Sequence, residues 1–246
     1  MLKRLSVVVA ALALCAPGAH ADLISRGKSL YQQGCISCHG LSARGVQPYG
    51  HTRGAGGVRG AGPSLAGVGA LAADLYLSAG YMPLRNARQQ PVRHQPLYSA
   101  DDIRALVAYI GSLGGPPIPH AHPERGSLPQ GLRLYTENCA GCHQMDAQGG
   151  LVIGALPPPL QSASPTQIAE AVRVGPYLMP RFPKDVLSDR QLDSIIAYVE
   201  LTKHPVDRGG WGIGHIGAIP EGLVAWLLAG TVLVVLARII GERRGE

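Results

Sequence analysis

Two copies of one five-residue pattern decide how this chain is read: Cys35-Ile36-Ser37-Cys38-His39 and Cys139-Ala140-Gly141-Cys142-His143. They hold four of the five cysteines in 246 residues. The repeat extends beyond the motifs. At the motif offset of 104 residues, three residues ahead of the first motif recur ahead of the second: Gly27 with Gly131, Leu30 with Leu134 and Tyr31 with Tyr135. The chain therefore contains two homologous units, and we predict a short helix leading into each motif, over Ile24–Gln33 and Gly131–Asn138.

A second pair of matching segments closes each unit. Apolar residues recur at positions i, i+3, i+4 and i+7, which is the stripe of an amphipathic helix. At an offset of 89 residues, Ile103, Leu106, Val107, Tyr109 and Ile110 correspond to Leu192, Ile195, Ile196, Tyr198 and Val199. Each unit is thus predicted to be helical, with one helix before the motif and one at its end.

The pattern C-x-x-C-H is typical of covalent attachment of c-type haem. The thiols of Cys35, Cys38, Cys139 and Cys142 would form thioethers with two haem groups, and His39 and His143 would each ligate an iron. A zinc site would need its two halves to meet from 104 residues apart, and a thioredoxin-like pair would need a βαβ context that the sequence lacks. Haem also explains a chain with only 12 aromatic residues, because the macrocycle fills each small core.

Two methionines are the expected sixth ligands of the irons. Met82 in Tyr81-Met82-Pro83 and Met179 in Leu178-Met179-Pro180 lie in similar loop contexts between the motif and the last helix of each unit. His/Met ligation is the cytochrome c arrangement that raises the reduction potential. Met145 is too close to His143 to reach the opposite face of the haem, so we expect it at the surface.

Other residues are candidates for ligating the irons or for orienting the motif histidines. His51, His94, His120 and His122 are alternative ligands that we expect instead to be exposed loop residues. Carbonyls in the segments around Pro63 and Pro158 are candidates to accept the imidazole N–H of the two motif histidines. Nothing in the sequence pairs a nucleophile with a base, so the expected chemistry is one-electron transfer with no catalytic residues of the chain's own.

Charge is divided unevenly between the units. Residues 22–115 hold nine Lys or Arg against four Asp or Glu, whereas residues 116–203 hold seven against eight. No basic run is interleaved with aromatic residues, so nucleic acid is not an expected partner. The basic first unit is predicted to dock an electron-transfer partner, with Arg85, Arg88 and Arg93 contributing.

Both ends of the chain indicate a membrane. Residues 1–21 combine Lys3 and Arg4, an apolar run and Ala19-His20-Ala21, which predicts a signal peptide, with a retained anchor as the alternative. Near the other end, residues 221–241 are long and apolar enough to span a bilayer, with Arg238 able to snorkel. Arg243 and Arg244 then place residues 242–246 in the cytoplasm and both units on the extracytoplasmic side of the cell membrane.

The chain resembles the dihaem cytochrome c subunit, cytochrome cc, of the actinobacterial menaquinol–cytochrome c reductase, the bcc complex. The resemblance covers nearly the whole chain. It rests on Gly27-Lys28-Ser29-Leu30-Tyr31 before the first motif, on Gly62-Pro63-Ser64-Leu65, on the two Met-Pro pairs and on the second motif. Its most discriminating part is Gly209-Gly210-Trp211-Gly212-Ile213-Gly214 with Ile219-Pro220-Glu221-Gly222 ahead of the span.

The resemblance implies a function as an electron-transfer subunit of a quinol–cytochrome c reductase. Electrons would enter from a Rieske iron–sulfur protein held beside cytochrome b, cross both haems and leave to a haem–copper terminal oxidase. Two other classes stay open from the residues alone. One is a dihaem subunit of a haem–copper oxidase, and the other is the cytochrome subunit of a periplasmic dehydrogenase.

The expected fold is all-α, with two tandem class I cytochrome c domains followed by a C-terminal transmembrane helix. The domains are expected at residues 22–115 and 130–203. A Pro/Gly-rich linker, expected to be extended, covers residues 116–129, and residues 204–220 form a juxtamembrane segment.

Overall fold

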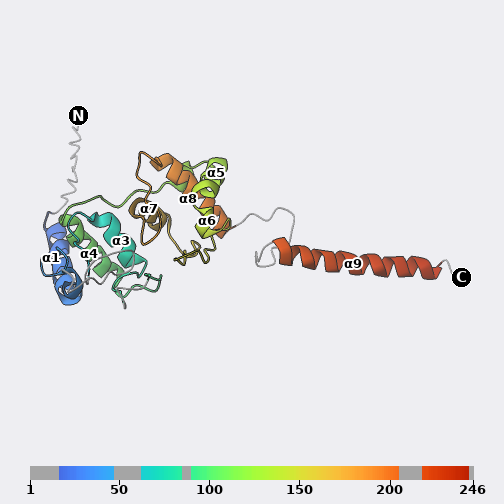
Figure 1. Ribbon diagram of the computed structural model, residues 1–246, viewed down its shortest axis with the longest axis horizontal. Coiled ribbons are helices and arrows are strands. Elements are labelled where there is room, and N and C mark those ends of the chain that lie inside the picture. The colour runs from blue at the N-terminus through green and yellow to red at the C-terminus, as the bar shows by residue number, and fades with distance from the viewer. Residues whose placement is uncertain (1–16, 47–61, 85–89, 205–217, 244–246) are drawn as a thin grey trace, which may run out of the picture. The chain divides into compact units, whose positions relative to one another are not determined.

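The computed structural model describes residues 17–46, 62–84, 90–204 and 218–243. Within these ranges the regular structure is helical, and extended pairing is limited to two isolated bridges, Val46 with Gly62 and Val152 with Ala155. The chain divides into two units, Met1–His204 and Pro205–Glu246. The first unit contains both sequence repeats as two helical lobes (Figure 1).

Within the described residues, the first lobe contains four helices. They are α1 (Pro17–Gly34), α2 (Ile36–His39), α3 (Gly69–Ser78) and α4 (Ala100–Ser112). Its core contains Tyr31, Leu106 and Ile110. The rings of Tyr31 and Tyr109 lie 5.3 Å apart where α1 packs on α4.

The second lobe repeats this arrangement. It comprises a 3-10 turn at Pro123–Arg125, α5 (Leu128–Asn138), α6 (Ala140–His143), α7 (Pro165–Val174) and α8 (Asp189–Lys203). Tyr135 and Tyr198 take the places of the first lobe's tyrosine pair, with ring centroids 5.0 Å apart. Leu134, Ile195 and Val199 are among the buried residues around them.

The repeated glycines, Gly27 and Gly131, lie where the first and last helices of each lobe cross. A Cβ on Gly27 would lie 1.9 Å from the carbonyl oxygen of Ala105, and one on Gly131 would lie 2.0 Å from that of Ser194. No side chain fits at either crossing, because ordinary contacts begin near 3.4 Å. In each lobe, the glycine lets the first helix and the last helix approach closely enough to close the core.

The predicted helices are present, and they begin earlier than expected. α1 starts at Pro17, before the predicted cleavage site, and α5 starts at Leu128 instead of Gly131. Two helices, α3 and α7, were not predicted from the sequence. The stretch predicted as a linker is without helix up to His122, but its end is folded into the second lobe, since the His122 N–H donates to Asp193 at 2.8 Å and that of Ser127 to Ser194 at 3.0 Å.

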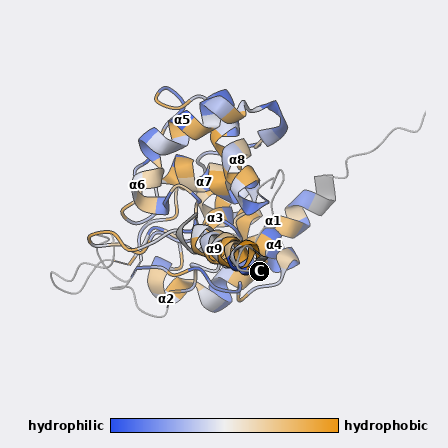
Figure 2. Ribbon diagram, turned by 90° about the vertical axis from the view of Figure 1, so that its right-hand side faces the viewer, coloured by the Kyte–Doolittle hydropathy of each residue, from blue (hydrophilic) through white to orange (hydrophobic). Residues whose placement is uncertain are grey.

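The second unit contains α9 (Ala218–Arg243). Its segment Gly222–Glu242 is long and apolar enough to cross a membrane, and none of it is buried within the protein. Figure 2 shows that α9 is coloured mostly as hydrophobic. Leu227, Leu233 and Val234 of this helix are exposed. This helix agrees with the predicted C-terminal span.

Candidate haem sites

The second motif is a tight, hydrogen-bonded turn between α5 and the rest of its lobe. The Cys139 N–H donates to the Tyr135 carbonyl at 2.8 Å, which continues α5 into the motif, and the His143 N–H donates to the Cys139 carbonyl at 2.9 Å. Cys139 is half-buried and Cys142 exposed, and both are free thiols. Burial raises the pKa of the Cys139 thiol to about 11.

His143 is held in the orientation that a metal ligand needs. Its side chain is buried, and Nδ1 lies 3.1 Å from the carbonyl oxygen of Pro158. A carbonyl can only accept, so Nδ1 donates and Nε2 keeps its lone pair. Burial also lowers the pKa of His143, although the Pro158 hydrogen bond opposes this, and the neutral imidazole is the form that binds metal.

One cavity brings the second set of predicted residues together. Cys139, Cys142, His143 and Met179 all line a cavity of about 530 Å³. The other walls are largely apolar, with Leu160, Ile168, Val172, Phe182, Ile195 and Val199 among them. A predominantly apolar cavity of this size with two thiols, an imidazole and a thioether fits a covalently bound haem c.

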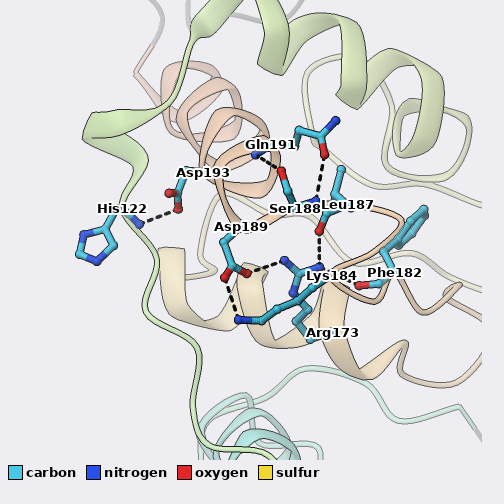
Figure 3. Close-up of polar contacts among 9 residues, drawn as sticks. All are labelled: His122, Arg173, Phe182, Lys184, Leu187, Ser188, Asp189, Gln191 and Asp193. Atoms are coloured by element: carbon cyan, nitrogen blue, oxygen red, sulfur yellow. Dashed lines mark hydrogen bonds and ion pairs between the residues drawn. The ribbon is translucent and has the colours of Figure 1, made fainter.

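Met179 reaches this cavity on a loop that a buried arginine holds in place. Arg173 of α7 donates to the carbonyl of Phe182 at 2.8 Å and to that of Leu187 at 2.7 Å (Figure 3). It also pairs with Asp189 at 2.7 Å, and Lys184 pairs with the same carboxylate. Arg173 was not predicted as a site residue, because a single arginine on a helix gives no sign in the sequence that it is buried.

A capping box at the start of α8 fixes the C-terminal end of this loop. Ser188 accepts from the N–H of Gln191 while the Gln191 side chain accepts from the N–H of Ser188, a capping box (Figure 3). Ser164 and Gln167 form the same arrangement at the start of α7. The loop between α7 and α8 is therefore anchored by Arg173 of α7 and by the capping box at the start of α8.

The first motif has the same local geometry. The His39 N–H donates to the Cys35 carbonyl at 2.9 Å, and His39 Nδ1 lies 2.8 Å from the carbonyl oxygen of Pro63. Both predicted carbonyl acceptors, Pro63 and Pro158, are thus confirmed. Met82 lies after α3, where its N–H donates to the Tyr76 carbonyl at 3.0 Å.

The remaining sequence candidates have other surroundings. His94 and His120 are exposed, His122 is half-buried at the surface with Glu124 at 3.0 Å, and Met145 is exposed as predicted. His51, Arg85 and Arg88 lie outside the described residues.

The docking role predicted for Arg93 needs correction. Its guanidinium donates to the Ser162 carbonyl at 2.9 Å and to the Gln167 side chain at 2.8 Å, both in the second lobe. Arg93 is therefore engaged within the protein.

One buried carboxyl lies on α7 near the first lobe. Glu170 is fully buried, with Asp74 of the first lobe as its charged neighbour. Burial, together with the charge of Asp74 on α3, raises the pKa of Glu170 to about 9. This side chain is therefore protonated at neutral pH.

Comparison with known families agrees with both sites. The family model described as Cytochrome c matches residues 24–114, and that described as Cytochrome C oxidase, cbb3-type, subunit III matches residues 126–199. The chain is therefore a c-type cytochrome with two cytochrome c domains and two covalently bound haem c groups. This excludes the zinc and thioredoxin interpretations of the motifs.

Relatives over nearly the full length define the family more narrowly. The chain is 34% identical to the cytochrome bc1 complex cytochrome c subunit of Corynebacterium diphtheriae, covering 90% of this chain and 81% of that protein. It is also 34% identical to the Mycobacterium bovis protein of the same description, covering 90% and 78%. The Cbb3-type cytochrome c oxidase subunit CcoP of Azospirillum is 27% identical over 70% of this chain and 60% of its own length. The chain belongs to the family of cytochrome c subunits of the cytochrome bc1 complex.

Proposed function

We propose that this chain carries single electrons from the Rieske protein of a menaquinol-oxidising bc complex to a haem–copper terminal oxidase. The observation that carries the proposal is the 34% identity over 90% of the chain to cytochrome c subunits of bc1 complexes. Two haem domains followed by a membrane anchor support it, because such a chain can replace a diffusing cytochrome c.

The haem ligands follow the motif positions. Cys35 and Cys38 would attach the first haem and Cys139 and Cys142 the second, and the irons would be ligated by His39 with Met82 and by His143 with Met179. When bound, each haem supplies a reversible one-electron couple between ferrous and ferric iron. The chain's own residues position it: the Pro63 and Pro158 carbonyls orient the imidazoles, and Arg173 holds the Met179 loop.

The direction of transfer follows from charge and attachment. The second lobe, nearer to α9 in the sequence, takes the input from the Rieske protein, and the basic first lobe reduces the oxidase. The charges after the span place both lobes on the extracytoplasmic side. Replacing Arg85 and Arg88 with Gln then slows oxidase reduction at low ionic strength, whereas Arg104→Gln serves as the control. Equal rates would refute the assignment of output to the first lobe.

The likeness to CcoP favours a second candidate, a dihaem subunit of a haem–copper oxidase. A mild-detergent purification from native membranes, followed by a reduced-minus-oxidised absorbance spectrum, separates the two. Haem b and haem c bands with Rieske and cytochrome b subunits support the proposal, and additional haem a bands indicate an attached oxidase. Haem c with oxidase subunits and no Rieske protein supports the second candidate, and a copurifying dehydrogenase refutes both.

A further inference from the structure

The cavity of the second motif has a wall that its own lobe does not supply. Besides the residues of the second lobe, the first lobe contributes Leu75, Tyr76, Tyr81, Gln90, Pro91 and Arg93 to the lining. A cytochrome c domain would be expected to enclose its haem by itself or to leave an edge open to water. Here, residues of the first lobe cover that side of the cavity.

Five hydrogen bonds hold the wall against the rim of the cavity. Gln90 donates to the Leu156 carbonyl at 2.9 Å and accepts from the Leu156 N–H at 2.8 Å. Arg93 donates to the Ser162 carbonyl and to Gln167. Gln167 in turn donates to Ser78 of α3 at 2.9 Å. Backbone groups of Leu156 and Ser162 take part in three of these five hydrogen bonds, so the side chains of the wall are tied to the main chain of the second lobe.

The wall itself presents aromatic rings. Tyr76 and Tyr81 pack edge to face with centroids 5.9 Å apart, and burial raises the pKa of both phenols. Tyr81 also immediately precedes Met82, whose N–H is bonded to the Tyr76 carbonyl. The same short segment therefore carries the proposed iron ligand of the first haem and a wall of the second haem's cavity.

We infer that the first lobe completes the second haem site: Tyr76 and Tyr81 shield the haem edge, and Arg93 is the positioning residue that keeps them there. The inference rests on the haem assignment and is independent of the direction of transfer and of the partners.

The wall has a defined effect on the second haem. Ferric haem carries one more positive charge than ferrous haem, so water at the haem edge stabilises the ferric form and a dry aromatic wall disfavours it. The cation of Arg93 at the same wall acts in the same direction. Closing the wall thus raises the reduction potential of the second haem, and opening it lowers that potential.

Spectroelectrochemical titration of the full-length, detergent-solubilised holoprotein tests this inference. Met179→His identifies the component that belongs to the second haem. Arg93→Ala and Tyr76→Ala are each expected to favour oxidation of that component about tenfold, a fall of about 59 mV for one electron. The first haem is expected to keep its potential.

The controls separate a loss of shielding from a loss of structure. Arg104→Ala removes an exposed cation of the first lobe that pairs with Asp101, and it is expected to leave both potentials unchanged. Haem content and helicity are measured in every variant. A folded, fully loaded Arg93→Ala or Tyr76→Ala protein whose second potential equals that of Arg104→Ala would overturn the inference, and so would a shift confined to the first haem.

Discussion

The close crossing of α5 and α8 offers a direct test of why the second lobe needs Gly131. Replacing Gly131 with Ala puts a Cβ 2.0 Å from the Ser194 carbonyl oxygen, where ordinary contact begins near 3.4 Å. The two helices must therefore separate by more than 1 Å. That separation also loosens the Tyr135–Tyr198 pair and the contact of Leu134 with the core.

The cost can be estimated from these contacts. Overpacking a well-filled interface costs about 1–3 kcal/mol, and the separation of two helices belongs at the upper end of that range. Ala regains about 1 kcal/mol through its higher helix propensity. A net loss of about 2 kcal/mol corresponds to about 10 °C in the melting temperature of a domain of this size.

Calorimetry of the full-length holoprotein measures this loss. The matched control is Gly141→Ala, because a Cβ there meets nothing within 4 Å and the first motif carries Ser37 at the equivalent position. We expect the melting temperature of the second lobe to fall in Gly131→Ala and to stay unchanged in Gly141→Ala. Equal melting temperatures in the two variants would show that the crossing is not constrained as described.

Three further outcomes follow from the second lobe. Met179→Ala is expected to abolish the sulfur-to-iron charge-transfer band of one ferric haem and to lower its potential, and a spectrum with both bands intact would exclude Met179 as a ligand. Arg173→Met leaves the Phe182 and Leu187 carbonyls without their donor and is expected to cost about 3 kcal/mol in denaturant unfolding; a loss below about 0.5 kcal/mol would contradict the buried network. The folded state keeps the Glu170 proton up to a pKa of about 9 whereas the unfolded state loses it near 4.5, so stability falls between these pH values by up to about 1.4 kcal/mol per unit. Glu170→Gln should remove this component of the pH dependence, and an unchanged slope would refute it.

Much of the fold could be predicted from the sequence because the chain contains an internal repeat. The offset of 104 residues aligned Gly27 with Gly131 and Tyr31 with Tyr135, and the structure shows these pairs at equivalent helix crossings. The apolar stripes located α4 and α8 for the same reason. An internal repeat and an apolar stripe are local patterns, so they can be recognised in one sequence without a structure.

The missed elements had weaker or overlooked signals. α7 begins with Ser164, Pro165 and Gln167, a capping sequence that could have predicted it. α3 begins after Val68 without a side-chain cap, so no comparable signal marks its start.

The contacts across the two lobes could not be predicted. Arg93 reads as a surface cation in sequence, and only the fold brings it to Ser162 and Gln167 of the other lobe. The same holds for Tyr81, which lies far in sequence from the cavity it lines. Such contacts depend on tertiary structure, to which hydrophobic periodicity and residue type give no guide.

The most direct test of the central claim is quinol-driven reduction of the haems in the purified native complex. Menaquinol is added under anaerobic conditions, and the haem c bands are followed with and without extraction of the Rieske protein. The account predicts that quinol reduces both c-type haems and that removing the Rieske protein stops it. Haems that stay oxidised with menaquinol while the Rieske protein is present, or that are reduced equally well without it, would contradict the account.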